Sequence, residues 1–440
     1  MIHLQPIDRS ILRIAIPSII SNITVPLLGL VDITIVGHIG DASYIGAIAV
    51  GGMIFNVIYW VFGFLRMGTS GMTSQAHGRD DRQEMMRILC RSFVVALSVA
   101  LLVLIFRRPL FHGVMRLVSA EGGVVQLVDT YFNICVWGAP AVLCLHGLTG
   151  WFIGMQNTRI PMFVSIMQNI VNIAASLIFV CICGMSVDGV ALGTLVAQYA
   201  GFAVSFLFFL KRYRDLHCFT LPSGIFLRGA MMRFFRVNSD IFIRTLFLVA
   251  VSFFFLSAGA SQGTVILAVN TLLMQLFTLF SYVMDGFAYA GEALCGHAKG
   301  AGNLRSMYAT IRRLFLWGAV VTAIYTLVYA FGGMSFLGLL TDDASVVASS
   351  ADYLPWAVAI PAAGVAAFIW DGVFIGLTAT RAMMYTLLLS ALVFFASYML
   401  FGQRWGNHAL WFSFVAYLFM RGVIQTVLFS FYKKRDALSC

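Results

Sequence analysis

The stretch Pro26-Leu-Leu-Gly-Leu-Val-Asp32-Ile-Thr-Ile-Val-Gly37 places one carboxylate inside a long apolar segment. The segment runs from Ile11 to Val36, no basic residue stands beside Asp32, and Pro26 lies six residues before it. A carboxylic acid is costly in hydrocarbon, so such a residue indicates a functional site. A proline removes a backbone hydrogen bond and permits a helix to bend. We therefore take Asp32 as a candidate ion-coupling group and Pro26 as a candidate hinge.

The composition indicates an integral membrane protein built from helices. The 440-residue chain is 60% hydrophobic and 10% charged, whereas soluble domains carry roughly 25% charged residues. Its apolar runs reach the roughly 18 residues that span a membrane as a helix, and the sequence lacks the short alternating segments of a β-barrel. We predict twelve spans, at residues 11–36, 45–75, 88–106, 122–147, 160–183, 189–210, 234–258, 264–290, 308–333, 345–375, 383–401 and 409–432.

The positive charges follow the connections between these spans. The net charge is +10, but the chain has no basic stripe interleaved with aromatics that would suit nucleic acid. The termini and loops fall into two sets that alternate along the chain, one on each side of the membrane. One set contains 21 Lys and Arg residues, and the other contains 4. Because positive loops stay in the cytoplasm, we expect both termini there, an even number of spans, and a place in the cell inner (plasma) membrane.

Two internal matches divide the chain into repeated halves. Trp151–Arg159 matches Val373–Arg381, and Gln75–Gly78 matches His297–Gly300, and both matches have the same offset in the numbering, 222. Six spans per half make the two repeats parallel, which is a transporter arrangement.

The predicted fold is an all-α membrane protein of twelve transmembrane helices in two pseudo-symmetric six-helix lobes. We expect an N-lobe at residues 1–210 and a C-lobe at 231–440. Between them we expect a cytoplasmic linker at 211–230, the longest polar connection in the chain.

Polar residues inside the fifth and sixth spans are candidate partners of Asp32. Asn169, Asn172 and Ser176 are spaced i, i+3 and i+7 and share one helical face, while Thr194 and Gln198 are one turn apart. Such side chains also hold helices together without any further role, at about 0.6 kcal/mol each. Because Asp32 is available as a partner inside the membrane, we favour an ion-coupling site for these side chains.

The carboxylate itself has two interpretations. If unpaired, burial raises its pKa and makes it a proton carrier. Alternatively, Arg66 on the second span pairs with it, and Asp32 is then structural.

The second half has its own polar residues within the spans. Asp240 and Arg244 are one turn apart and predict a structural salt bridge. Asp285 and Glu292 share a face, and Asp371 lies near the basic end of the tenth span, where we expect a helix-end or gate role.

The sequence contains no signature of an enzyme or a resident cofactor. It has no Walker loop, nucleophile elbow, His-Glu-x-x-His helix or Cys-x-x-Cys pair, and the spacing of its eight cysteines matches no metal site. We expect no cofactor and no metal, and any transport must then use an ion gradient.

These features resemble the multidrug and toxic compound extrusion (MATE) family, and its DinF-like branch in particular. Pro26 and Asp32 match the bent first helix and its acid. The stretches Gly63–Gly71 and Asp285–Leu294 are similar to ones typical of that branch. The resemblance implies that Asn172 and Thr194 are partners of the first-helix acid.

The chain departs from the family pattern at one position. The family commonly has a second aspartate one turn after the matched asparagine, and here that residue is Ser176. Two carboxylates favour sodium, whereas one buried acid with amide and hydroxyl neighbours suffices for a proton.

We therefore expect a monomeric, proton-coupled antiporter that exports amphipathic, mostly cationic drug-like compounds by alternating access. A sodium-coupled exporter is one alternative. A second is a lipid or lipid-linked oligosaccharide flippase of the related superfamily. Such a flippase needs several basic residues that face the central cavity and bind phosphate, and only three arginines lie within the spans of this chain. A membrane-embedded enzyme needs paired acids or a His–Asp set at one face, which the sequence does not present.

Overall fold

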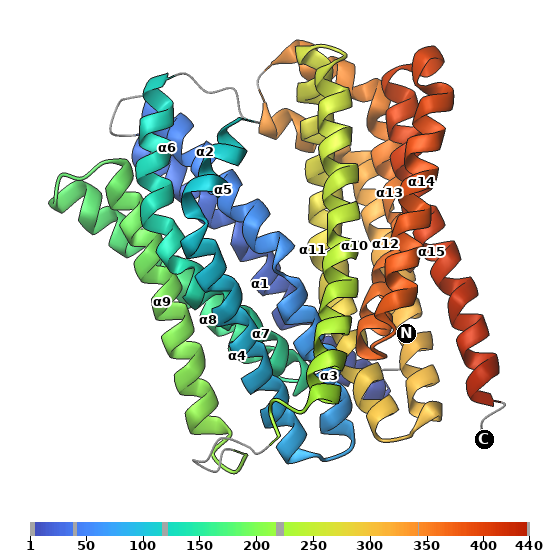
Figure 1. The fold of residues 1–440 in the computed structure, drawn as a ribbon. Helices are drawn as coiled ribbons and strands as arrows, with labels where there is room; N and C mark the ends of the chain where they lie inside the picture. The colour runs from blue at the N-terminus through green and yellow to red at the C-terminus, as the bar shows by residue number, and fades with distance from the viewer. Residues whose placement is uncertain (1–4, 38–41, 117–121, 217–223, 342, 438–440) are drawn as a thin grey trace. The chain divides into compact units, whose positions relative to one another are not determined.

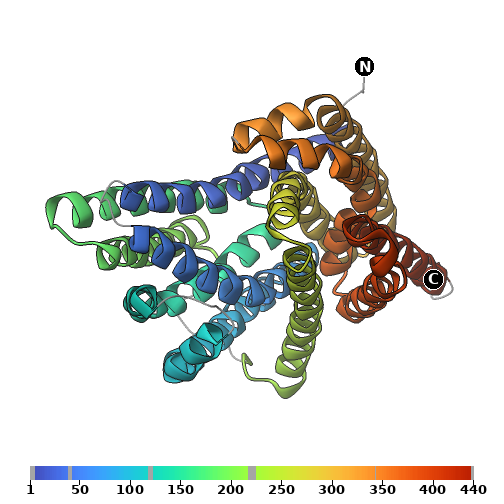
Figure 2. The same ribbon diagram turned by 90° about the horizontal axis from the view of Figure 1, so that it is seen from above.

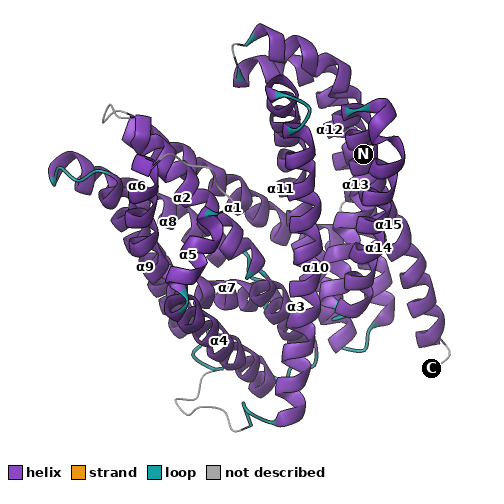
Figure 3. Cartoon of the chain, turned by 45° about the horizontal axis from the view of Figure 1, so that its top comes forward, coloured by secondary structure: helices purple, strands orange, loops and turns teal. Residues whose placement is uncertain are grey.

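The computed structural model describes residues 5–37, 42–116, 122–216, 224–341 and 343–437. Within these ranges the side chains of residues 25–33, 35–37, 42, 122 and 434–437 are not described. Every regular element of the described chain is helical (Figure 3), which confirms the predicted fold class.

The first half contains the following helices (Figure 1): α1 (Pro6–Gly37), α2 (Ala42–Val61), α3 (Phe64–Gly78), α4 (Arg82–Ile105), α5 (Arg107–Met115), α6 (Gly122–Cys135), the 3₁₀ turn η1 (Val136–Gly138), α7 (Ala139–Gly154), α8 (Arg159–Leu177), the π-helical segment η2 (Ile178–Ile182) and α9 (Val187–Arg212). The second half contains α10 (Arg228–Ala260), α11 (Thr264–Gly300), α12 (Leu304–Leu340), α13 (Ala344–Gly376), α14 (Thr380–Trp405) and α15 (Asn407–Ala437).

Eleven helical stretches among the described residues are long and apolar enough to cross a membrane. α1, with 32 residues, precedes them at the position of the first predicted span. Two predicted spans of the first half are interrupted. The second span breaks at Phe62 and Gly63 between α2 and α3, and the fourth passes through η1 between α6 and α7.

Residue contacts divide the chain into two compact units. We call Ile20–Phe235 the N-unit, and Met1–Ile19 together with Arg236–Cys440 the C-unit. α1 and α10 both cross the boundary between the two units. The C-unit therefore contains the start of α1, the first helix of the first half, and the N-unit contains the start of α10, the first helix of the second half. The lobes expected at 1–210 and 231–440 stay a prediction, and residues 217–223 of the expected linker lie outside the described chain.

The start of α1 is held by helices of the C-unit. Asp8 is fully buried, where its carboxylate accepts a hydrogen bond from Trp317 Nε1 at 3.1 Å and pairs with Arg313 at 3.5 Å. Ala15 packs against Gly286 of α11, where a Cβ atom would overlap the Ala15 carbonyl. A buried carboxylate with these partners is costly to displace, so α1 begins at a fixed place in the C-unit.

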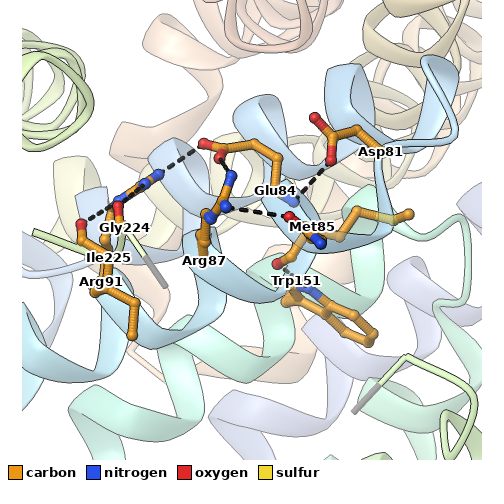
Figure 4. A network of polar contacts seen from close by, with 9 residues as sticks. Asp81, Glu84, Met85, Arg87, Arg91, Trp151, Gly224 and Ile225 are labelled. Atoms are coloured by element: carbon orange, nitrogen blue, oxygen red, sulfur yellow. Dashed lines mark hydrogen bonds and ion pairs between the residues drawn. The ribbon is translucent and has the colours of Figure 1, made fainter. Parts of the chain in front are cut away.

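The start of α10 is held in the same manner in the N-unit (Figure 4). Arg91 of α4 is buried and donates from Nε to the Ile225 carbonyl at 2.8 Å and from Nη2 to the Gly224 carbonyl at 3.3 Å. Its Nη1 also pairs with Glu84 at 2.7 Å. Arg91 and Arg313 are related by the offset of the internal repeat, so the two halves use equivalent arginines for this task.

The same offset recurs in the helix boundaries. It separates the first residue of α1 from that of α10, the first residue of α4 from that of α12, and the last residue of α7 from that of α13. α4 is capped by Asp81, which accepts from the Glu84 backbone N–H, and α12 is capped by Asn303, which accepts from that of Ser306. Equivalent positions in the two halves therefore have the same capping role.

Close helix contacts repeat as well. Gly150 of α7 lies against the Arg66 carbonyl of α3, and Gly372 of α13 lies against the Ala288 carbonyl of α11. No side chain fits in either place, because a Cβ atom would overlap rigid backbone. In the C-unit α11, α13 and α15 pack side by side (Figure 2).

Aromatic side chains fill the cores. In the N-unit the ring of Phe55 stacks on that of Phe132 at 5.3 Å between α2 and α6, and Trp151 meets Phe209 at 5.3 Å between α7 and α9. α9 contributes side chains to both of these cores, and α8 contributes to the second.

Candidate ion-coupling site

The acid and the proline of the first helix lie within α1, but their side chains are outside the described part of the chain. The roles expected for Asp32 and Pro26 therefore stay predictions, as does a pair between Asp32 and Arg66. Arg66 lies on α3, with its backbone against Gly150 of α7.

Three predicted site residues come together where α8 meets α9. Asn172 and Ser176 are fully buried and one turn apart on α8. The Asn172 Nδ2 group donates to Thr194 Oγ1 of α9 at 3.0 Å. Ser176 packs against Gly193 of α9, where a larger residue would overlap the Ser176 hydroxyl.

This contact leaves two buried oxygen atoms unused. Among the described residues, Asn172 Oδ1 and Ser176 Oγ have no hydrogen-bond partner. An unpaired buried polar atom costs about 1–3 kcal/mol. A proton donor beside this face of α8 can satisfy one of these oxygens, and a cation can be bound by both, so the pair has the chemistry of a site that is completed by another group.

The other amides of the first half act elsewhere. Asn169 donates to the backbone carbonyl of Thr24 at 2.8 Å, and the Thr24 hydroxyl lies 3.1 Å from Ser165 Oγ. These bonds join α8 to α1 two residues before the proline. Gln198 packs instead against Gly138 at the end of η1.

The repeat offers a second view of the first-half site. At the offset of the repeat, the counterparts of Asp32, Asn172 and Ser176 are Phe254, Phe394 and Tyr398. The ring of Phe254 packs against that of Phe394 at 5.8 Å and against that of Tyr398 at 5.3 Å. In the second half, therefore, the equivalents of the three candidate residues are direct neighbours.

The second half has a buried charge cluster around Asp371 of α13. Its Oδ2 accepts from Arg244 of α10 and, at 2.7 Å, from Arg421 of α15, while its Oδ1 accepts from Gln425 Nε2 at 2.6 Å. All four side chains are buried. Asp285 of α11 is close enough to Arg421 to interact with it electrostatically.

This cluster differs from the sequence-based interpretation of the same residues. Asp371 is buried between α10, α13 and α15, whereas we expected it at a helix end or a gate. Arg244 pairs with Asp371, whereas we expected it to pair with Asp240. Asp240 accepts from the Thr380 hydroxyl at 2.8 Å. Glu292 is buried on α11, with its backbone against Gly376.

Gln425 was missed by sequence reasoning. A signal was present, because Arg421 and Gln425 are one turn apart inside the last apolar span. Two such residues on one helical face predict a buried polar partner, but they do not say which helix supplies it.

Comparison with known proteins agrees with this architecture. The MatE family model matches residues 17–178 and 241–399. The chain is 34% identical to the DNA damage-inducible protein F of Escherichia coli K12, over 96% of this chain and 92% of that protein. It is 22% identical to the multidrug resistance protein MdtK of Yersinia pseudotuberculosis, over 79% of this chain and 76% of that protein. A crystal structure of MATE in the bent conformation covers 98% of each chain, with a TM-score of 0.89 and 18% identity.

The fold and the relatives define a multi-pass membrane transporter with twelve transmembrane helices in two lobes. The chain belongs to the MatE family, and within it the chain is DinF-like.

Proposed function

We propose that this chain is a secondary active exporter of amphipathic, mostly cationic compounds, driven by proton antiport through Asp32. The observation that carries this proposal is the unpaired Oδ1 of Asn172 beside the unpaired Oγ of Ser176. A protonated carboxyl group has one O–H to donate, whereas an ionised one can only accept. A buried acceptor in this position therefore favours the protonated acid.

The repeat supports Asp32 as the missing donor. Position 254 in the second half is in contact with positions 394 and 398, which correspond to 172 and 176. α1 is moreover tied to α8 through Thr24, less than three turns before residue 32. Both observations favour an acid that reaches the α8 face.

The transport cycle follows from these groups. An ionised Asp32 favours a bound cation or an open cavity. A proton from outside neutralises it, the acid then donates to Asn172, and α1 bends at Pro26, which releases the substrate. The membrane potential supplies about 2.3 kcal/mol per charge at 100 mV, and each pH unit adds about 1.4 kcal/mol.

The cellular setting belongs to the same proposal. We place the chain as a monomer in the inner membrane with both termini in the cytoplasm, and its two lobes alternate access by moving about the 211–230 connection. The multidrug substrate class comes from relatives such as MdtK. The serine at position 176, where the MATE family commonly has a second aspartate, favours protons over sodium.

Reconstituted vesicles test the mechanism. Efflux of a fluorescent organic cation is followed under an imposed pH gradient and then under an imposed sodium gradient. We expect the pH gradient to drive efflux and Asp32→Asn to abolish that drive. Asp129→Asn is the matched control, because Asp129 forms a partly exposed pair with Arg108 at 3.3 Å.

Two results contradict the proposal. Undiminished pH-driven efflux in Asp32→Asn would remove Asp32 from the mechanism. Efflux that requires sodium alone would replace the proton with sodium as the coupling ion.

A further inference from the structure

A cavity of about 280 Å³ lies in the N-unit between α3, α4 and the first turn of α10. Three arginines and one glutamate supply its charges, and an apolar wall lies beside them. The side chains that matter are Arg79, Glu84, Arg91 and Arg233, with Met72 and Ile88 as the apolar wall.

The charges in this cavity do not cancel. The Glu84 carboxylate is already used by Arg91 at 2.7 Å and by Arg87 at 3.6 Å. Arg233 contacts a neutral group, Gln75 Oε1, at 3.5 Å. Arg79 and Arg233 are exposed and so present two positive charges to whatever enters.

Arg91 gives the cavity a fixed wall. By holding the carbonyls of Gly224 and Ile225 (Figure 4), it sets where α10 begins, and Gly229 and Ala230 of that first turn line the cavity. N–H groups of a first helical turn have no acceptor within the helix, and the helix dipole favours an anion there. The space beside Gly229 is open.

Exposed apolar residues lie close in the sequence to the cavity-lining residues of α10. Phe226, Leu227 and Met232 are exposed by 69%, 60% and 54%. Bulky apolar side chains that alternate with Arg228 and Arg233 are typical of a segment at the membrane interface. A volume of about 280 Å³ lies below the range of about 300–1,000 Å³ that is usual for drug-sized ligands. It suits a headgroup whose chains lie outside.

We propose that this cavity binds the phosphate group of an anionic phospholipid. Arg79 and Arg233 contact the phosphate, and Arg91 acts as a positioning residue through the Gly224–Ile225 backbone. The exposed apolar residues at the start of α10 contact the acyl chains. Basic pockets between membrane helices are recognised sites for anionic lipid headgroups.

Native mass spectrometry of the full chain tests the proposal. The protein is delipidated in detergent, incubated with phosphatidylglycerol or phosphatidylcholine, and scored for retained lipid after exchange into fresh detergent. The wild type should retain phosphatidylglycerol. The double variant Arg79→Gln/Arg233→Gln should lose retention about tenfold or more, because the two basic residues that contact the phosphate are removed.

The control is Arg82→Gln/Lys211→Gln, which also removes two positive charges, from exposed residues of α4 and α9 outside the cavity lining. It should retain the lipid like the wild type. Equal retention of phosphatidylglycerol in all three proteins overturns the site, and so does equal retention of phosphatidylcholine in the wild type. A third arm adds millimolar inorganic phosphate. Displacement of the lipid by phosphate alone would assign the site to a soluble phosphate and overturn the lipid.

Discussion

The two halves of the chain share one helix plan but place their polar groups at different points of it. In the first half, positions 172 and 176 carry Asn and Ser with unused oxygens, whereas the equivalent positions 394 and 398 carry Phe and Tyr in ring contact with Phe254. The second half instead buries Asp371 between two arginines, and its first-half counterpart is the neutral Thr149.

The helices of the two halves also differ in their continuity. The first half interrupts its second and fourth spans and ends α8 in a π-helical segment, while α11 and α13, the counterparts of the two interrupted spans, are continuous. Discontinuous helices are typical of the sites of secondary transporters. The shared helix plan therefore carries an incomplete polar site in the first half and a buried ion cluster in the second.

The largest expected effect concerns the charge cluster of the second half. Asp371→Asn leaves Arg244 and Arg421 buried without their carboxylate, and removal of one partner of a buried ion pair costs about 4 kcal/mol. We expect a marked fall of the midpoint of thermal unfolding in detergent. Asp352→Asn, an exposed aspartate of the same helix, should leave the midpoint unchanged. An equal midpoint for both variants would show that the cluster is not a structural element.

The next prediction compares equivalent positions directly. Phe394 is fully buried, and Phe394→Ala should cost about 3 kcal/mol through lost packing. Asn172→Ala should cost about 1 kcal/mol, because one hydrogen bond is lost, but it should suppress pH-driven efflux. Unfolding midpoints and vesicle efflux are measured on both variants. If Phe394→Ala lost coupling while it kept stability, the division of tasks between the halves would be wrong.

A third prediction tests the shared backbone. Gly150→Ala and Gly372→Ala both force a Cβ atom onto a carbonyl of a neighbouring helix, so each should destabilise by about 2 kcal/mol. Gly338→Ala, in the same kind of helix but with open space around it, should be neutral or stabilising. Unequal losses at Gly150 and Gly372, measured by thermal unfolding, would limit the equivalence of the halves.

The smallest expected effect concerns the equivalent helix caps. Asp81→Ala and Asn303→Ala each remove one side-chain acceptor from a first helical turn and should cost about 1 kcal/mol. Hydrogen exchange at the amides of Glu84 and Ser306 measures this locally. Unchanged protection in either variant would contradict a capping role.

The sequence is sufficient to predict the helical class, the spans and the internal repeat, because hydropathy and matched segments are visible along the chain. It is not sufficient to predict the breaks at Phe62–Gly63 and Val136–Gly138, since apolar residues continue through both. The partners of Asp371 could not be assigned either. They come from helices 127 and 50 residues away, and only packing decides which charged residues meet.

The attachment of Asp8 to Trp317 has a consequence for biosynthesis. These two residues are 309 positions apart, and a ribosome adds about 5–20 residues per second. The beginning of the first helix therefore waits about 15–60 s for the helix that completes it, while the N-unit can already close around Arg91. For most of its synthesis a nascent chain therefore carries Asp8 without Trp317 and Arg313, the partners of this acid in the folded protein.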